Sequence, residues 1–344
     1  MKLGLDTYSY RYAAGLWEYT PHENIPMTVD HYLQKAADFN LDGLQLCDAR
    51  HLDSLEYGYV SELRERAGLL GLYLELGTGG TNPDHIQNMV RVAHVMGSPV
   101  VRTFVGKPRP ASAQAMRELL SATAGEIAQV TSVCERYGVS LALENHQDLT
   151  TDELLTLLEL IDSEWVGICF DTGNPLALLE DPLDSAMAFG PLIRSVHLKD
   201  YQVAARPDGF SLVGCALGEG VVELRGILDF LATRVAEVNL NIETYMGRHT
   251  FEVLDEEYLD RVPEASAAAL GRTLRLVRDR GLPREPQLPI ERGASEDEIL
   301  SAEDDLVLES VRWAQQAVKR EEQGSGFGGD RPFDAAQGGP VRGE

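Results

Sequence analysis

Short apolar runs recur along the first 245 residues, and stretches with helical spacing separate them. Eight of these runs read as strands: residues 3–10, 41–48, 72–78, 99–106, 140–146, 166–174, 195–202 and 238–245. Most have continuously apolar centres, which is typical of strands buried on both faces of a parallel sheet.

The stretches between these runs have helical patterns with recognisable ends. Thr28 is placed to cap a helix over residues 28–40. Asn82, Pro83 and Gly97 mark the cap, first turn and end of the helix over residues 82–97. Further helices are expected over residues 111–138, 150–162, 224–235 and 256–281.

Eight strand–helix alternations predict an α/β fold, a (β/α)8 TIM barrel over residues 1–281 that forms the catalytic domain. A doubly wound open sheet is the alternative. No GxGxxG motif follows the first strand, and eight units is the number that closes a barrel, so the closed barrel is favoured.

The pattern changes after residue 281. Residues 282–322 begin with a proline-rich linker and continue as a C-terminal helical extension over residues 295–320, which we expect to dock on the barrel or on another subunit. Residues 323–344 are glycine-rich and poor in bulky apolar residues, so we expect a disordered tail.

Composition narrows the classes of partner. The 344-residue chain has a formal net charge of −25, which argues against nucleic acid as a partner. No signal peptide and no apolar run of membrane-spanning length is visible, so we expect no membrane partner and a cytoplasmic location. The cysteines are far apart without a CxxC pair and read as buried reduced thiols: Cys47, Cys134, Cys169 and Cys215.

Four consecutive strands, the fifth to the eighth, carry a potential metal ligand at or near their ends: Glu144, Asp171, His197 and Glu243. In such a barrel the active site forms at the carboxyl ends of the strands. Each residue alone has a structural explanation: the aspartate caps a helix, the histidine is a satisfied core residue, and the glutamates pair with basic residues. Together, three carboxylates at one rim would repel unless a cation held them.

Three carboxylates and one imidazole suit Mn²⁺ or Mg²⁺, with Zn²⁺, Co²⁺ and Fe²⁺ as alternatives. The ion would polarise a substrate carbonyl, and a neighbouring glutamate would take the proton of the acidified C–H group. Glu144 and Glu243 lie three strands apart and would approach a substrate from different sides, an arrangement suited to isomerisation or epimerisation.

Other polar residues near the rim are candidates for substrate contact. His146 points to the same side as Glu144, and Arg102 binds a substrate oxygen or neutralises the acids. Lys199 and Asp200 are expected to pair with each other behind the ligands. Asp6 and Glu75 are weaker rim candidates, and the aromatic-rich loop over residues 8–24 is either a lid for a sugar ring or loop packing.

Five ordered motifs, ALENH, FDTGNP, IRSVHLKD, ALGEGVVE and NIETY, resemble the xylose-isomerase-like barrel superfamily of sugar phosphate isomerases and epimerases. The resemblance implies that Glu144, Asp171, His197 and Glu243 bind one divalent cation, that both glutamates are the acid/base pair, and that the protein forms a homo-oligomer. Many of these epimerases have histidine where this chain has Asn174, a residue expected near substrate or metal.

The same barrel and metal set also serves dehydratases of keto-inositols and decarboxylases of oxo-sugar acids. The first hypothesis is therefore a metal-dependent isomerase or epimerase of a sugar or sugar phosphate, and the second is a metal-dependent lyase on a keto-sugar or oxo-sugar acid. The barrel is shared with DNA-repair endonucleases, but these need more histidines and a basic surface than this chain provides.

Overall fold

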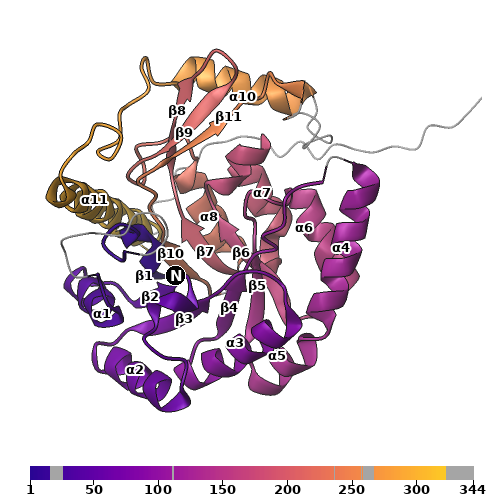
Figure 1. The fold of residues 1–344 in the computed structure, drawn as a ribbon, viewed down its shortest axis with the longest axis vertical. Coiled ribbons are helices and arrows are strands. Elements are labelled where there is room, and N and C mark those ends of the chain that lie inside the picture. Colours follow the sequence, from indigo (N-terminus) through magenta and orange to yellow (C-terminus); the bar gives the residue numbers. More distant parts are fainter. Residues whose placement is uncertain (16–25, 111, 236, 257, 259–266, 323–344) are drawn as a thin grey trace, which may run out of the picture.

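The structure is a computed structural model that describes residues 1–15, 26–110, 112–235, 237–256, 258 and 267–322. Its centre is a closed, all-parallel barrel of eight strands (Figure 1). In chain order these are β1 (Lys2–Asp6), β2 (Gly43–Leu46), β3 (Tyr73–Gly77), β4 (Val100–Thr103), β5 (Ser140–Glu144), β6 (Val166–Asp171), β7 (Ile193–Leu198) and β10 (Asn239–Ile242). Pairing of β1 with β10 closes the barrel, which confirms the predicted (β/α)8 fold.

Helices surround these strands, and several begin and end where the sequence predicts. Asn82 accepts a hydrogen bond from the His85 N–H at the start of α3, and Gly97 ends this helix with φ +79°. The outer helices are α1 (Val29–Asp38), α2 (Tyr57–Leu69), α3 (Pro83–Met96), α4 (Ala113–Ala128), α5 (Thr131–Tyr137), α6 (Thr151–Ile161), α7 (Pro182–Phe189), α8 (Leu224–Arg234) and α10 (Ala267–Arg280).

One helix predicted over residues 111–138 is two helices, α4 and α5. The break lies at Gln129 and Val130, where the buried Val130 donates its N–H to the carbonyl of Ile127, three residues back, instead of continuing the four-residue pattern. No proline or glycine marks this position, so the pattern of apolar residues alone did not reveal the break.

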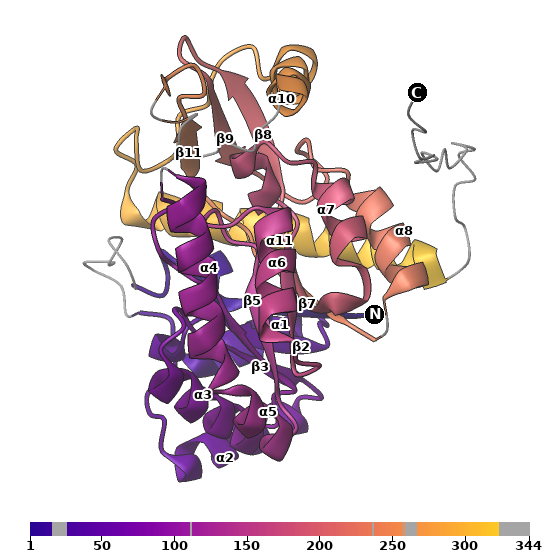
Figure 2. The same cartoon turned by 90° about the vertical axis from the view of Figure 1, so that its right-hand side faces the viewer.

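The seventh predicted strand, residues 195–202, is also wrong in extent. The barrel strand β7 ends at Leu198, and β8 (Tyr201–Ala205) begins a separate antiparallel sheet with β9 (Phe210–Gly214) and β11 (Arg248–Phe251). Figure 2 shows this added sheet beyond the barrel, beside α10. The physical cause is the buried Asp200, whose carboxylate accepts four backbone N–H groups and turns the chain; the donors are Tyr201, Gly218, Gly220 and Val222.

The C-terminal extension contains a helix, α11 (Glu296–Glu322), that docks on the barrel of its own chain. Val307, Val311 and Ala314 on this helix are buried. The buried Glu303 accepts the backbone N–H groups of Tyr12 at 2.9 Å and of Ala13 at 3.0 Å, which ties the helix to the loop after β1. The domain boundaries at residues 281 and 322 stay predictions, and the tail predicted over residues 323–344 lies outside the described residues.

Two further expectations concern the whole chain. The four cysteines are free and buried, as predicted. Within the described part of the chain, no helix combines the length and apolar character needed to cross a membrane.

Candidate metal centre

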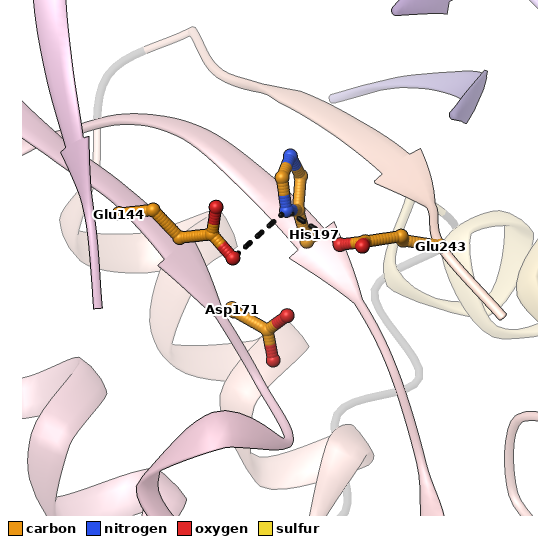
Figure 3. Close-up of side chains that lie close together, drawn as sticks. All are labelled: Glu144, Asp171, His197 and Glu243. Atoms are coloured by element: carbon orange, nitrogen blue, oxygen red, sulfur yellow. Dashed lines mark ion pairs between the residues drawn. The ribbon is translucent and has the colours of Figure 1, made fainter. Parts of the chain in front are cut away.

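Four buried side chains converge at the carboxyl end of the barrel (Figure 3). Glu144, Asp171, His197 and Glu243 each offer one ligand atom, and these atoms all lie within 4.8 Å of one another. The residues come from β5, β6, β7 and the position just after β10. The structure thus brings together all four residues that the sequence predicts as metal ligands.

Strand register explains why these residues meet. Asp171 and His197 are direct partners between β6 and β7, and the Glu243 N–H donates to the Leu198 carbonyl at the end of β7. Side chains two residues apart on a strand point to the same face, so Ser195 and His197 both point into the barrel. The four ligand candidates are therefore the last inward positions on neighbouring strands.

Asp171 fulfils both roles that its position after an apolar strand suggests. Its Oδ1 accepts the backbone N–H groups of Gly173 at 2.7 Å and Asn174 at 2.9 Å, which caps the turn that follows. Its Oδ2 lies 2.7 Å from the Lys199 Nζ inside the cluster. Capping and site formation are compatible because the two oxygens serve different partners.

Two cations neutralise part of the cluster. Arg102 forms a buried ion pair with Glu144, and the Lys199 Nζ lies 3.2 Å from the Glu243 Oε1 in addition to its contact with Asp171. Burial favours the neutral form of Glu144, but Arg102 and His197 outweigh it and hold the pKa of this carboxyl well below its usual range. Burial likewise opposes ionisation of Glu243, yet Lys199 and His197 lower its pKa to about 2.

Repulsion still remains among the acids. Burial, together with the charges of Glu243 and Glu144, raises the pKa of Asp171 despite its contact with Lys199. Burial and Glu243 also raise the pKa of Asp6 to about 7; the Oδ2 of this residue lies 3.8 Å from the His197 Nε2. An added cation would relieve this repulsion.

The buried polar atoms fit a divalent cation. Among the described residues, the Glu144 Oε2, the His197 Nδ1 and the Glu243 Oε2 lack a hydrogen bond of normal geometry. The His197 Nδ1 lies 2.6 Å from the Glu243 Oε2 and 3.6 Å from the Glu144 Oε1. The Glu144 Oε2 is paired with Arg102, whereas the His197 Nδ1 and the Glu243 Oε2 face each other inside the cluster. Buried polar atoms are normally hydrogen-bonded, so these two exceptions indicate a ligand. Three oxygens and one nitrogen form a donor set for Mn²⁺, Mg²⁺ or a related ion.

A cavity of about 270 Å³ adjoins the cluster, and four of the predicted substrate-contact residues line it: Arg102, His146, Asn174 and Lys199. Asn174 also donates to the Glu144 Oε1 at 3.2 Å. Asp200 is not on this wall, and the predicted pair of Lys199 with Asp200 is wrong, because the lysine pairs with Asp171 and Glu243 instead. Burial raises the pKa of Asp200 to about 6 although its oxygens accept four backbone N–H groups.

Aromatic pairs form two parts of the cavity wall. Phe104 stacks on His146 with ring centroids 4.5 Å apart, and Tyr245 stacks on His249 at 4.6 Å. Burial lowers the pKa of His249 to about 4, so this ring is neutral at neutral pH. Sequence reasoning missed His249 because it lies on β11, in the sheet that was not predicted. The helical and strand patterns also gave no reason to select Phe104.

The loop predicted over residues 8–24 contributes aromatic side chains both to the cavity and to its own packing. Tyr8 lines the cavity, whereas Tyr10 donates to Asp304 and Tyr12 donates to the Met246 carbonyl, so these two pack the loop in place. Its remainder, from residue 16 onward, lies outside the described residues. Glu75 is not at the rim; it lies deeper inside the barrel, where four side chains donate to it.

A larger cavity of about 540 Å³ lies between α4, α6 and α7. It is separate from the four-ligand cluster, and neither histidine nor cysteine is among the described residues that line it. We therefore assign the chemistry to the smaller cavity.

Comparisons with known proteins agree with this geometry. Residues 33–261 match the family described as the xylose isomerase-like TIM barrel. The chain is 27% identical over 250 residues to 3-oxo-isoapionate decarboxylase of Pectobacterium atrosepticum, which covers 72% of this chain and 86% of that protein. The structure resembles D-allulose 3-epimerase from Methylomonas sp. with a TM-score of 0.57, 16% identity, and coverage of 92% of this chain and 98% of that one. It also resembles the IolI protein with a bound zinc atom, with a TM-score of 0.55, 14% identity, and coverage of 83% and 100%.

Proposed function

The chain belongs to the xylose isomerase-like TIM barrel family, and from this we propose that it is a divalent-metal-dependent lyase acting on an oxidised sugar, with decarboxylation of an oxo-sugar acid as its reaction. Glu144, Asp171, His197 and Glu243 would hold the ion, with Mn²⁺ or Mg²⁺ as the proposed metal. When bound, the ion would supply Lewis acidity that stabilises negative charge developing on a substrate carbonyl oxygen. The zinc in the IolI structure supports metal binding in this fold.

The observation that carries this proposal is the difference between the two glutamates. Glu243 and Lys199 line the cavity, whereas Glu144 does not line it and pairs with Arg102 and Asn174. Epimerisation with two opposed glutamates requires both to reach the substrate. One carboxylate and one ammonium group on the cavity wall fit better with a reaction that needs a single proton transfer at carbon.

The charges on the cavity wall support an anionic substrate. Three cations line the cavity, Arg50, Arg102 and Lys199, and each pairs with an acid on or behind the wall: Asp48, Glu144, Asp171 or Glu243. With all of these groups ionised, the three cations and four acids leave a net charge of about −1, which a bound divalent ion would change to about +1. A carboxylate substrate is attracted to such a wall, whereas a neutral ketose gains nothing from it.

The residues on the wall have roles that follow from their protonation. Loss of carbon dioxide from a carboxylate β to a carbonyl leaves the electron pair of the broken carbon–carbon bond on the neighbouring carbon, where one proton must be added. Burial opposes the charge of Lys199, but Asp171 and Glu243 outweigh it and raise its pKa well above the usual range, so its Nζ carries the proton to be donated. After donation the neutral lysine takes a proton from water, and the ionised Glu243 beside it stabilises the charged form.

The aromatic pairs suit a carbohydrate as the carbon skeleton. The stacked rings of Phe104 and His146 and those of Tyr245 and His249 offer flat apolar faces against which the C–H face of a sugar packs. The name of the Pectobacterium relative, 3-oxo-isoapionate decarboxylase, supports decarboxylation of an oxo acid.

A second candidate is the isomerase or epimerase of a sugar or sugar phosphate. The observation that favours it is the convergence of both glutamates on one point, together with the fold likeness to D-allulose 3-epimerase. This reaction would require Glu144 to separate from Arg102 when the substrate binds.

One experiment separates the two candidates. The Mn²⁺-loaded protein is incubated in heavy water with a panel of ketoses and oxo-sugar acids, and the products are weighed by mass spectrometry. A lyase converts an oxo acid with loss of 44 mass units or 18 mass units (carbon dioxide or water) and takes up deuterium, whereas an isomerase preserves the mass of a ketose apart from deuterium. Mass-conserving turnover of ketoses with no conversion of oxo acids would refute the lyase.

A Lys199→Met variant tests the assigned proton donor. This substitution leaves all four ligand residues in place, so we expect metal binding to persist while turnover falls by about 10²- to 10⁴-fold, the range for loss of a general acid. A Lys35→Met variant, which changes a lysine on α1 that pairs with Asp304, is the matched control. Unchanged turnover in the Lys199 variant would exclude this residue as the donor.

A further inference from the structure

A second buried polar cluster lies inside the barrel below the metal centre, and one of its members contacts a predicted ligand. The Gln45 Oε1 lies 2.5 Å from the His197 Nε2, the ring nitrogen that points away from the other three ligands. Both residues are fully buried. The opposite ring nitrogen, Nδ1, is the one that faces Glu243 and Glu144.

The orientation of the Gln45 amide is fixed by its other partner. Its Nε2 donates to the Glu75 Oε2 at 2.7 Å and to the Ser195 Oγ at 3.2 Å. An ionised carboxylate only accepts hydrogen bonds, so the amide nitrogen must face Glu75 and the amide oxygen must face His197.

Glu75 is held as an acceptor by four donors. Besides Gln45, the Ser195 hydroxyl donates to it at 2.8 Å, and the amides of Asn241 at 2.9 Å and Asn239 at 2.7 Å do the same. The orientation of Asn241 is fixed in turn, because Tyr73 donates its hydroxyl to the Asn241 Oδ1 at 2.8 Å. Every member of this cluster therefore has a defined donor or acceptor role.

From this chain of contacts we infer that Gln45 is a positioning residue for the metal centre, held by Glu75, which keeps the His197 proton on Nε2 and leaves Nδ1 free to bind the ion. The inference rests on the proposed metal function. An amide oxygen can face Nε2 only if that nitrogen carries a proton. Asp6 does not replace Gln45 as the acceptor, because its Oδ2 lies 3.8 Å from the His197 Nε2, which is too long for a hydrogen bond. Metal-bound histidines commonly donate their other ring N–H in this way, which fixes the ring and its tautomer.

A purely structural role for the polar cluster predicts different behaviour. In that case Gln45 would only satisfy Glu75, and its replacement would change the stability of the protein without changing the binding of metal. The two readings separate when metal affinity and the protonation of the ring are measured directly.

The affinity test uses Mn²⁺ alone as the probe, titrated into the metal-free full-length protein by calorimetry. In Gln45→Met the side chain keeps its length but has no amide oxygen to accept the hydrogen bond of the His197 Nε2–H group. We expect Mn²⁺ to bind about 10- to 100-fold more weakly. In the control Ser195→Ala, Glu75 loses one donor but Gln45 keeps its orientation, so affinity should stay within about twofold.

Nuclear magnetic resonance of the ¹⁵N-histidine-labelled, Zn²⁺-loaded natural protein tests the ring without any substitution. We expect a proton on the His197 Nε2 and none on Nδ1. A proton on Nδ1 would overturn the inference even if a variant failed to fold.

The outcomes distinguish the two proposals. Failure of the natural protein to bind Mn²⁺ or Zn²⁺ would refute the metal site and this role with it. Normal Mn²⁺ binding by both the natural protein and Gln45→Met would refute the positioning role alone.

Discussion

Two clusters of buried polar residues lie at different depths in the barrel, and their acids differ in how completely the carboxylate oxygens are hydrogen-bonded. At the rim, Glu144 and Glu243 each have an oxygen without a hydrogen bond of normal geometry. Deeper in the barrel, both oxygens of Glu75 accept hydrogen bonds, from four side chains in total. All three glutamates are at most 3% exposed, so burial does not distinguish them.

This difference in hydrogen bonding identifies the rim cluster, and not the cluster around Glu75, as the candidate ligand site. A carboxylate that is fully hydrogen-bonded is stable in the interior as it stands, whereas carboxylates that face one another need a cation. The change occurs over two residues, from Asn241 on β10 to Glu243 just after this strand, and from Ser195 to His197 on β7. Hydrogen-bond satisfaction, more than burial or residue type, therefore separates the candidate site from the supporting structure.

The largest expected effect comes from breaking the rim cluster. Asp171→Asn keeps an oxygen that can cap Gly173 and Asn174 but removes a charged ligand. We expect turnover of the identified substrate to fall by at least about 10³-fold, because both the ion and the groups that it orients are lost. Removal of metal with a chelator should have the same effect on the natural protein.

The control for this substitution is Asp162→Asn, which changes an exposed acid at the end of α6. Its turnover should match that of the natural protein. If Asp171→Asn retained natural turnover and Mn²⁺ affinity, the rim would be a structural cluster like the one around Glu75.

The second effect tests the deeper cluster. Glu75→Leu leaves three buried donors and the half-buried Asn239 without their acceptor, and we expect the free energy of unfolding in urea to fall by about 3 kcal/mol. Asp171→Asn in the metal-free protein should cost much less, since it relieves repulsion among the acids. Equal losses for the two variants would remove the distinction between the clusters.

The barrel and the four ligand candidates were predictable from sequence because each depends on a local pattern. Continuous apolar runs mark strands buried on both faces, and an acid or imidazole at the end of each run marks the rim. Asp171 is the clearest case, because an acid directly after the apolar residues Ile168, Cys169 and Phe170 needs a charged or hydrogen-bonding partner.

The added sheet and the aromatic wall depend on contacts that are distant in sequence. Asp200 ends β7 by binding backbone groups as far away as Val222, and no local pattern reveals this. His249 reaches the cavity only because β11 pairs with β9. The same limit hid Gln45, whose role depends on contacts with Glu75 and His197 on other strands.

A third prediction measures ligand binding through stability. At a Mn²⁺ concentration 100 times the dissociation constant, the free energy of unfolding of the natural protein should rise by about 2.7 kcal/mol, because the ion binds only the folded state. Ser195→Ala should show the same rise from a lower starting value, whereas Asp171→Asn should show almost none. A rise of equal size in Asp171→Asn would place the bound ion outside the rim.

Glu303 is intermediate between the rim acids and Glu75 in its hydrogen bonding, because it accepts from two backbone N–H groups instead of from four side chains. Burial raises the pKa of this carboxyl to about 7, although the Tyr12 and Ala13 N–H groups oppose the rise. A group whose pKa is higher in the folded state favours folding at low pH, and this contribution is lost as the pH rises toward 7. We therefore expect Glu303 to reduce the free energy of unfolding by about 2 kcal/mol between pH 5 and pH 8.

The measurement is urea unfolding of the metal-free protein and of Glu303→Gln across this pH range. Asp6 and Glu180 also have raised pKa values of about 7, so the natural protein and the variant should both lose stability, and the variant should lose less. Parallel pH profiles would show that the two N–H groups already stabilise the charged Glu303 fully.

The smallest effect concerns the part of the cavity wall that the added sheet contributes. His249 stacks on Tyr245 but is not one of the four ligands, so His249→Ala should raise KM about fivefold, with kcat and Mn²⁺ affinity nearly unchanged. His249→Phe keeps a flat ring and should recover most of the loss. A fall in kcat without a change in KM would mean that His249 acts on the reacting atoms, and the division between a metal-binding rim and a substrate-binding wall would then have to be redrawn.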